Sequence, residues 1–468
     1  VLFRSKGRKI MKVAKFGGSS VSTAEQIKKV LTIVNEDPER KIIIVSAPGK
    51  RHNDDIKTTD LLIRLYEKVL NKLNYESKKQ EIIQRYADIV EELGIGNDIL
   101  ITINDTLEEY IKHLSDKPNR LYDALLSCGE NFNAQLIAQY NNSQGIPTRY
   151  ISPKEAGLTV TDLPQQAQIL DSAYNEIYKL RDYDEKLIIP GFFGVSKQNY
   201  IVTFPRGGSD ITGAIIARGV RASLYENFTD VSGIYKANPN IINNPELIEE
   251  ITYREMRELS YAGFGVFHDE ALQPLYKDRI PVVIKNTNRP NDKGTYILHD
   301  REIDSKNVIS GISCDKGFTV INIKKYLMNR LVGFTRKILG VLEEFNISFD
   351  HMPSGIDNIS IIMRTNQIQG KESQVLNAIR KRCEVDELSI DHDLAVLMIV
   401  GEGMNQVVGT ASKITHALSE SNINLIMINQ GASEISMMFG IHEADAEKAV
   451  LSTYEFCYNG VCLKNLCK

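Results

Sequence analysis

The sequence predicts an α/β fold, a mainly parallel sheet sandwiched by helices, followed by two small α+β modules. Two patterns support this prediction. From Met11 to about residue 300, short β-rich runs alternate with helical patterns, as in successive βα units. After about residue 305 the pattern changes and the sequence repeats itself. A chain of 468 residues is also long enough for two or three domains.

The predicted strands are short runs rich in β-branched or aromatic residues. They cover residues 11–16, 41–46, 148–152, 186–192, 199–204, 222–228 and 280–286. Between the first two, Ser22 and Glu25 form a capping box at the start of an amphipathic helix. Residues 60–145 have a mostly helical pattern, which predicts a helical elaboration on the sheet or a lid.

An internal repeat defines the last third of the chain. Residues 328–363 align without a gap on residues 404–439, with 13 identities in 36 positions. Gly333 and Gly409 fall in register, as do Asn346 and Asn422. Duplication explains this, and each copy is predicted to run strand, turn, helix, strand, strand, helix. We therefore expect one catalytic domain over residues 11–300 and modules over 308–390 and 391–468.

Composition limits the classes of partner. The 56 Lys and Arg residues nearly balance the 60 Asp and Glu residues, so no overall basic field exists to hold nucleic acid. No apolar run is long enough to cross a membrane, and residues 1–10 lack the apolar core of a signal peptide. The six cysteines show no metal-ligand spacing, so we expect no metal site and a reducing cytoplasm. Residues 1–10 are interpreted as a non-native leader.

The segment KFGGSS follows the first predicted strand. Glycines let backbone N–H groups approach a phosphate closely, and Lys15 adds a full positive charge. The Walker pattern is absent because the only lysine precedes the glycines. By itself the segment also fits a Gly-Gly turn that merely packs a strand against a helix.

Three further segments carry charged groups near strand ends or turns, where open α/β sheets bind ligands. FPRGGSD contains a second Gly-Gly turn, with Arg206 suited to a carboxylate or phosphate and Asp210 at a helix start, where it could accept from a lysine or help to hold a metal. Otherwise Asp210 is only an N-cap and Arg206 a surface charge. In SCGENFNA, Glu130 is predicted to open a helix and bind an ammonium group; otherwise it is a first-turn Glu stabilised by the helix dipole. FTDVSGIYKANP ends a strand and offers nucleotide contacts.

The motifs KFGGSS, VSAPGK, TTDLL, GEN, PGFFG, RGGSD, TDVSGIY and VGEGM, in this order, resemble those of the aspartokinase family. The resemblance extends over nearly all of the chain from Met11. It implies an amino-acid-kinase fold with C-terminal ferredoxin-like ACT modules. It also implies a monofunctional aspartate kinase that uses ATP with Mg²⁺ to phosphorylate the side chain of L-aspartate, the first step of lysine, threonine and methionine biosynthesis.

The resemblance assigns roles to residues at matching motif positions. Lys15 would stabilise the transferring phosphoryl group, and Asp210 would organise that lysine. The implied aspartate site consists of Ser46, Thr59, Glu130, Phe192, Arg206, Gly207 and Ser209. The implied ATP site consists of Gly17, Gly18, Ser19, Thr229, Asp230, Tyr235 and Lys236.

The chain departs from the family pattern at one cation. Many aspartokinases have a phosphate-contacting lysine in a segment FGAKVLHP, whereas this chain reads AGFGVFHDEA, with Gly265 at the lysine position. Lys285 or Lys236 could substitute. The departure keeps open the interpretation of a catalytically inactive amino-acid sensor. A kinase for glutamate-like amino acids is a separate alternative.

The paired modules resemble regulatory modules that bind a free amino acid between two subunits. The implied effector site comprises Met328, Val332, Gly333, Phe334, Asp350 and Ser354. Asp350 would hold the effector ammonium, and Ser354 or backbone groups its carboxylate. Lysine is the preferred effector and threonine the alternative. The modules could instead be only dimerising sheet edges, and in either case we expect a homodimer.

Overall fold

The computed structural model describes residues 10–205, 207–264, 269–303, 308–431 and 433–460. Contacts divide the chain into two compact units. Unit 1 combines the described residues within Val1–Ile234, Leu247–Met256 and Gly265–Arg301, and unit 2 those within Tyr235–Glu246, Arg257–Phe264 and Glu302–Lys468. No helix in these described ranges has the length and apolar character that a membrane span requires.

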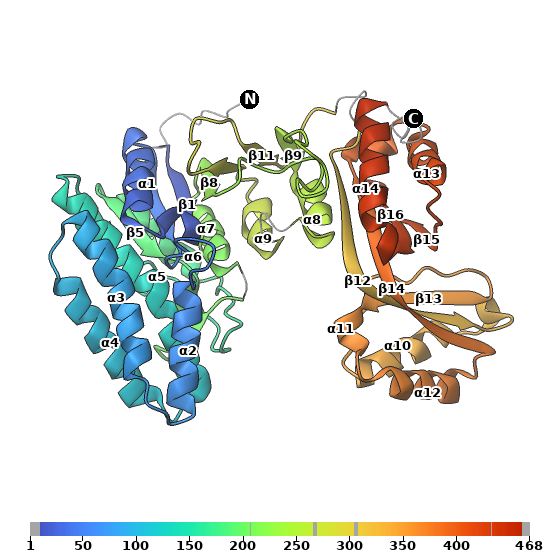
Figure 1. Ribbon diagram of the computed structural model, residues 1–468, viewed down its shortest axis with the longest axis horizontal. Coiled ribbons are helices and arrows are strands. Elements are labelled where there is room, and N and C mark those ends of the chain that lie inside the picture. Colours follow the sequence, from blue (N-terminus) through green and yellow to red (C-terminus); the bar gives the residue numbers. More distant parts are fainter. Residues whose placement is uncertain (1–9, 206, 265–268, 304–307, 432, 461–468) are drawn as a thin grey trace. The chain divides into compact units, whose positions relative to one another are not determined.

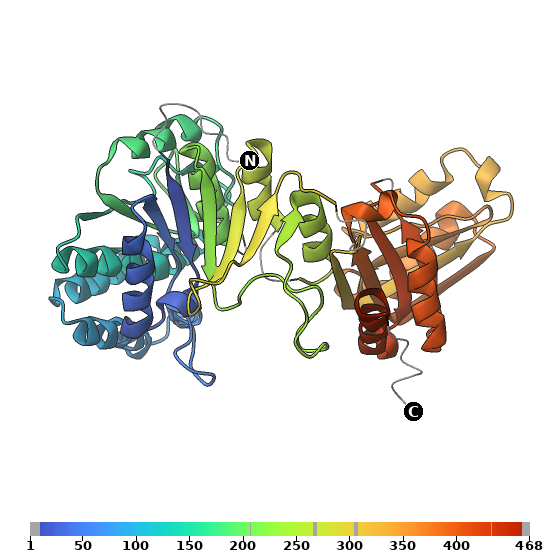
Figure 2. The same cartoon turned by 90° about the horizontal axis from the view of Figure 1, so that it is seen from above.

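Unit 1 is built on an eight-stranded sheet in the order β3-β5-β2-β1-β8-β10-β11-β9 (Figure 1). Neighbouring strands are parallel except for β10 and β11. The strands are β1 (Lys12–Phe16), β2 (Arg40–Val45), β3 (Thr148–Tyr150), β5 (Lys186–Pro190), β8 (Leu224–Thr229), β9 (Glu250–Thr252), β10 (Val282–Asn286) and β11 (Thr295–Leu298). Figure 2 shows them side by side, coloured from dark blue through green to yellow. The predicted mainly parallel sheet is confirmed.

One predicted strand lies outside this sheet. Residues 199–204 contain β7 (Ile201–Thr203), which pairs antiparallel with β6 (Phe193–Ser196) in a small sheet completed by β4 (Thr159–Val160). The reason is a tight turn in which Asn199 has a φ of 64° and the Tyr200 carbonyl accepts a hydrogen bond from the Ser196 N–H. This turn folds β7 back onto β6.

Helices cover both faces of the large sheet. They are α1 (Ala24–Glu36), α2 (Thr58–Leu70), α3 (Glu76–Leu93), α4 (Asp98–Leu114), α5 (Pro118–Ser143), α6 (Ala173–Tyr178), α7 (Gly208–Gly219) and α9 (Asp269–Lys277), with 3₁₀ turns η1 (Gly18–Val21) and η2 (Lys179–Asp182). The predicted helical region 60–145 corresponds to α2–α5. The predicted capping box is wrong, because Thr23 is the N-cap of α1 and its hydroxyl accepts from the Gln26 N–H. Helix α8 (Tyr253–Tyr261) begins in unit 1 and ends in unit 2.

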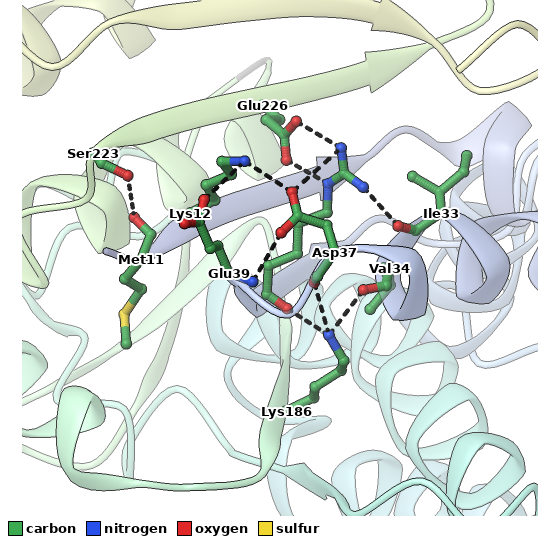
Figure 3. A network of polar contacts seen from close by, with 10 residues as sticks. Met11, Lys12, Ile33, Val34, Asp37, Glu39, Lys186, Ser223 and Glu226 are labelled. Carbon is green, nitrogen blue, oxygen red and sulfur yellow. Dashed lines mark hydrogen bonds and ion pairs between the residues drawn. The ribbon is translucent and has the colours of Figure 1, made fainter. Parts of the chain in front are cut away.

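The amino ends of the parallel strands are occupied by internal ion pairs (Figure 3). Arg40 binds the buried Glu226 carboxylate through two nitrogens, at 2.6 and 2.9 Å. Lys12 pairs with Asp37 at 2.8 Å. Lys186 donates to three backbone carbonyls between the last turn of α1 and the start of β2, including that of Val34 at 2.8 Å. These charges satisfy one another, so the opposite, carboxyl end of the sheet is where ligand-binding groups are expected.

Unit 2 contains the two repeats in one five-stranded antiparallel sheet, in the order β13-β12-β14-β16-β15. Its strands are β12 (Gly311–Lys324), β13 (Asn358–Arg364), β14 (Glu387–Val400), β15 (Met427–Gln430) and β16 (Ser436–His442). Its helices are α10 (Phe334–Glu344), α11 (Thr365–Ile368), α12 (Glu372–Cys383), α13 (Thr410–Glu420) and α14 (Ala446–Tyr454). The remaining short turns are η3 (Met328–Arg330), η4 (Glu402–Asn405), η5 (Glu443–Asp445) and η6 (Glu455–Asn459).

The predicted element order is found in the second repeat, whereas the described residues of the first repeat form no strand between α10 and β13. Two pairs of matched residues nevertheless have similar backbone conformations in both repeats. Gly333 and Gly409 are the N-caps of α10 and α13, with φ of 77° and 95°. Asn346 and Asn422 follow those helices with φ of 52° and 51°. Glycine and asparagine tolerate positive φ better than other residues, which explains why these positions are identical in both repeats.

The repeats share strands as well as a sheet. The core of the second repeat includes Ile309 and Ile312, which lie within the range predicted for the first module. Ile312 lies on β12, and the core of the first repeat begins at Ile321, farther along that strand. A register shift between Asp315 and Phe318 separates the two parts. The long strands β12 and β14 thus each serve both modules.

Candidate active site

Two motifs from distant parts of unit 1 meet at the carboxyl end of β1. Lys15 is the penultimate residue of β1, and its Nζ lies 2.6 Å from Oδ1 of Asp210 in the first turn of α7. Their side chains are only 9% and 12% exposed. Both Gly-Gly segments therefore contribute to one buried ion pair.

The turn after β1 packs backbone to backbone against the turn after β2. The Gly49 N–H donates to the Gly18 carbonyl at 2.8 Å. A Cβ added to Gly18 would lie 2.9 Å from the Ala47 carbonyl oxygen, and one added to Gly49 would lie 2.7 Å from the Gly18 carbonyl carbon. Only glycine fits there, and the turn leaves Ser19 exposed at the surface.

Helix α7 is held against the sheet on the face that carries Lys15. Its N-cap Gly207 has a φ of 74°, and a Cβ on Gly213 would lie 2.4 Å from the Tyr225 hydroxyl oxygen. That hydroxyl donates to the Asp210 carbonyl at 3.3 Å. This close packing fixes the start of α7 over β1 and β8.

Asn227 is a third member of the site, and the sequence prediction missed it. It lies on β8 beside Lys15 in the parallel register, and its Nδ2 donates to Asp210 Oδ1 at 3.0 Å. The signal in the sequence was an asparagine within a predicted strand, a position where asparagine is disfavoured.

Glu130 does not open a helix as predicted, because it lies in the middle of α5. The preceding Gly129 is a packing residue within that helix, where an added Cβ would lie 2.7 Å from the Cβ of Ala47. Glu130 is buried, and its Oε2 has no hydrogen-bond partner among the described residues. Burial raises its pKa to about 8, against the opposing effects of backbone N–H groups and Lys15.

The other predicted aspartate-binding residues surround the same strand ends. Ser46 directly follows β2 and is half-buried, and its carbonyl accepts from Asn133 Nδ2 at 2.8 Å. Thr59 is the second residue of α2. Phe192 has a φ of 77°, and its N–H donates to Thr212 of α7 at 3.0 Å. Ser209 is buried against Gly191. Arg206 lies outside the described residues.

The predicted nucleotide contacts fall into both units. Thr229 ends β8, and its hydroxyl donates to Asp230 at 3.1 Å in unit 1. Tyr235 and Lys236 belong to unit 2. There the Lys236 ammonium pairs with Glu246 and lies 4.5 Å from the centre of the Tyr458 ring.

Two parts of the chain match families of known proteins. Residues 11–286 match the amino acid kinase family, and residues 397–455 match an ACT domain. Aspartokinase 3 of Bacillus subtilis is 47% identical to this chain over 452 residues, which is 96% of this chain and 99% of that protein. The chain belongs to the aspartokinase family.

Solved aspartokinases share the fold. The aspartate kinase of Clostridium acetobutylicum is 42% identical, with a TM-score of 0.86 over 95% of this chain and 99% of that one. Escherichia coli aspartokinase III in complex with aspartate and ADP has a TM-score of 0.77 over 96% of this chain and 100% of that one, at 23% identity.

Lys285 does not replace the family lysine that is absent at Gly265. Lys285 pairs in register with Phe228, so its side chain lies on the sheet face opposite to Lys15. Burial lowers the pKa of Lys285, with Glu226 acting in the opposite direction. Gly265 itself lies outside the described residues, and Lys236 is engaged by Glu246.

The predicted effector residues of this aspartokinase occupy different environments. Met328 and Phe334 are buried in the first-repeat core, whereas Val332 is fully exposed and Ser354 is exposed. Asp350 accepts a hydrogen bond from the Tyr261 hydroxyl. Gly333 caps α10, whose first N–H groups form a suitable site for a carboxylate.

Proposed function

We propose that this aspartate kinase transfers the γ-phosphoryl group of ATP to the side-chain carboxylate of L-aspartate, at the carboxyl ends of β1, β2 and β8. The product, 4-phospho-L-aspartate, would enter lysine, threonine and methionine biosynthesis. The buried Lys15–Asp210 pair beside the diglycine turns is the observation that carries the proposal.

The nucleophile requires no catalytic base. A side-chain carboxylate has a reference pKa of about 4 and is therefore ionised at neutral pH. The chemical difficulty is to bring two anions together, the carboxylate and the triphosphate. Positive charge and oriented N–H groups are what such a reaction needs.

Lys15 supplies the positive charge in this proposal, and Asp210 keeps its ammonium group in place. The N–H groups of Gly17, Gly18 and Ser19 would contact the transferring phosphoryl group. In this proposal Mg²⁺ arrives with ATP, as part of the substrate. Thr229 and Asp230 would contact the nucleotide, and the same role remains a prediction for Tyr235 and Lys236.

Glu130 would bind the aspartate ammonium group. Its oxygen Oε2 is buried and unpartnered among the described residues, and a cationic donor would satisfy it. The roles of Ser46, Thr59, Phe192, Gly207 and Ser209 beside the substrate, and of Arg206 on its α-carboxylate, remain predictions.

A coupled assay for ADP, together with hydroxylamine trapping of an acyl phosphate, tests the proposal. We expect both signals with L-aspartate and MgATP. Turnover with N-acetylglutamate but not with aspartate would instead identify a kinase for glutamate-like substrates. Calorimetric binding of an amino acid with no trapped acyl phosphate would identify a sensor.

We further propose that lysine inhibits the enzyme by binding beside Asp350 and the start of α10. The Asp350 carboxylate suits the effector ammonium group, and the capped helix start suits its carboxylate. An Escherichia coli aspartokinase III of the same fold has been solved with lysine and aspartate. Lysine and threonine titrations of the kinase rate will decide between the two candidate effectors.

The same modules would form the homodimer. Large apolar side chains are exposed in unit 2, including Tyr326, Val332, Ile356, Val408 and Ile428. Ile428 lies on β15, an edge strand that can pair with another chain. Analytical ultracentrifugation should show a dimer, and a monomer at all concentrations would contradict this proposal. A cytoplasmic location also remains a prediction.

A further inference from the structure

One oxygen atom at the centre of the site receives two donors. Asp210 Oδ1 lies 2.6 Å from Lys15 Nζ and 3.0 Å from Asn227 Nδ2. Lys15 and Asn227 are direct neighbours on β1 and β8, so both approach Asp210 from the same face of the sheet.

An asparagine at position 227 lowers the stability of the fold. The residue is 2% exposed in the middle of the sheet, and its Oδ1 has no hydrogen-bond partner among the described residues. A buried amide without full hydrogen bonding destabilises a fold, and an apolar residue would pack more favourably in such a strand. Reversing the amide would place its oxygen against Asp210 Oδ1, so the contact with Asp210 determines its orientation.

We propose that Asn227 is a positioning residue for phosphoryl transfer. It holds the Asp210 carboxylate in place while the Lys15 ammonium group contacts the transferring phosphoryl group. In the ion pair, the ammonium and the amide share one oxygen. When the ammonium turns toward the phosphoryl group, Asp210 would otherwise become an unpaired buried charge. The Asn227 N–H keeps this carboxylate hydrogen-bonded and so lowers the cost of that movement. This inference rests on the proposed role of Lys15.

Two substitutions test the role of the amide. N227L keeps a similar side-chain size and removes the donor. We expect its kcat to fall about tenfold to 100-fold, as for the loss of a hydrogen bond to a charged group, with the KM values for aspartate and ATP within about twofold of wild type. The matched control is N141L. It removes a buried asparagine near the carboxyl end of α5 that donates a hydrogen bond to Thr148 and accepts one from Asn35. N141L should lower the melting temperature and leave kcat unchanged.

N227D gives a signature that a structural role would not produce. Its new carboxyl group can donate to Asp210 only when protonated, and two adjacent carboxyl groups raise the pKa of one of them. The ionisable groups facing this position are Lys15 on β1, Asp210 on α7 and Tyr225 on β8, whereas its β10 neighbour is Ile284. The ratio of N227D kcat to wild-type kcat should therefore rise as pH falls from 8.5 to 6, while the N227L ratio stays constant.

The outcomes separate this inference from the proposed function. A kcat of N227L within twofold of wild type, or an N227D ratio that does not change with pH, would overturn the role of Asn227. If N227L does not fold, the N227D ratio decides alone. If Lys15→Ala retains wild-type kcat, the proposed function of Lys15 fails first. If Lys15→Ala is inactive and both Asn227 variants behave as wild type, only the inference fails.

Discussion

The buried Glu130 predicts that aspartate binding releases a proton. Burial raises the pKa of this carboxyl group to about 8, so the free enzyme at pH 7 holds it mostly protonated. The aspartate ammonium group requires the ionised form. Binding near neutral pH must therefore expel the Glu130 proton, and the apparent affinity should increase as pH rises toward 8.

The magnitude follows from that pKa. With a pKa of about 8, the apparent dissociation constant is multiplied by 1 + 10^(8−pH), which falls about eightfold between pH 7 and pH 8.5. The protons released per aspartate bound should be about 0.9 at pH 7 and about 0.5 at pH 8. The sign is that of a carboxyl group with a raised pKa, for which lower pH favours the unliganded form.

Calorimetric titration of aspartate, in buffers with different enthalpies of ionisation, measures the proton count directly. The Glu130→Gln variant should release no proton from this site, bind aspartate about tenfold to 100-fold more weakly and lose the pH dependence. Glu91→Gln, an exposed change on α3, serves as the control and should behave as wild type. A proton count of zero at pH 7 in wild type, or an unchanged pH dependence in Glu130→Gln, would refute the reasoning.

Four further substitutions test other parts of the structure. Lys15→Ala should lower kcat about 100-fold to 1,000-fold in the ADP assay, because it removes a preorganised charge; an almost unchanged rate would exclude Lys15 from catalysis. Asp350→Ala should leave uninhibited kcat near normal and raise the lysine concentration needed for inhibition. Tyr261→Phe should lower that concentration, since its hydroxyl no longer competes for Asp350; identical inhibition curves would count against this pocket. Gly129→Ala would place a methyl group 2.7 Å from the Ala47 Cβ. It should lower the melting temperature and raise the KM for aspartate, and a wild-type KM would show that Glu130 had not moved.

Local sequence patterns predicted the elements well because those patterns act through neighbouring residues. The alternation of short β runs and helices corresponds to the parallel sheet and its covering helices. The repeat predicted two modules, and the matched glycines and asparagines take matched positive-φ conformations. The two Gly-Gly segments were identified as strand-to-helix turns, and the structure brings them to one end of the sheet.

The errors arose where packing between distant segments overrides local pattern. The glycine before Glu130 led us to predict a helix start there. Gly129 instead lies within α5, where its lack of a side chain allows close packing against Ala47. The run 199–204 reads as a strand of the parallel sheet, yet a tight turn folds it onto β6. Whether a segment forms a strand can be predicted from its own residues, whereas the strand with which it pairs depends on the rest of the chain.

From sequence, the order of the motifs and the residue types at each strand end were enough to predict the fold, the family and the pairing of Lys15 with Asp210. Register and burial decided what remained. They place Asn227 beside Lys15 and turn Lys285 to the other face of the sheet. They also enclose Glu130 so that its pKa rises. These properties depend on which strands lie side by side, and no single segment of the chain contains that information.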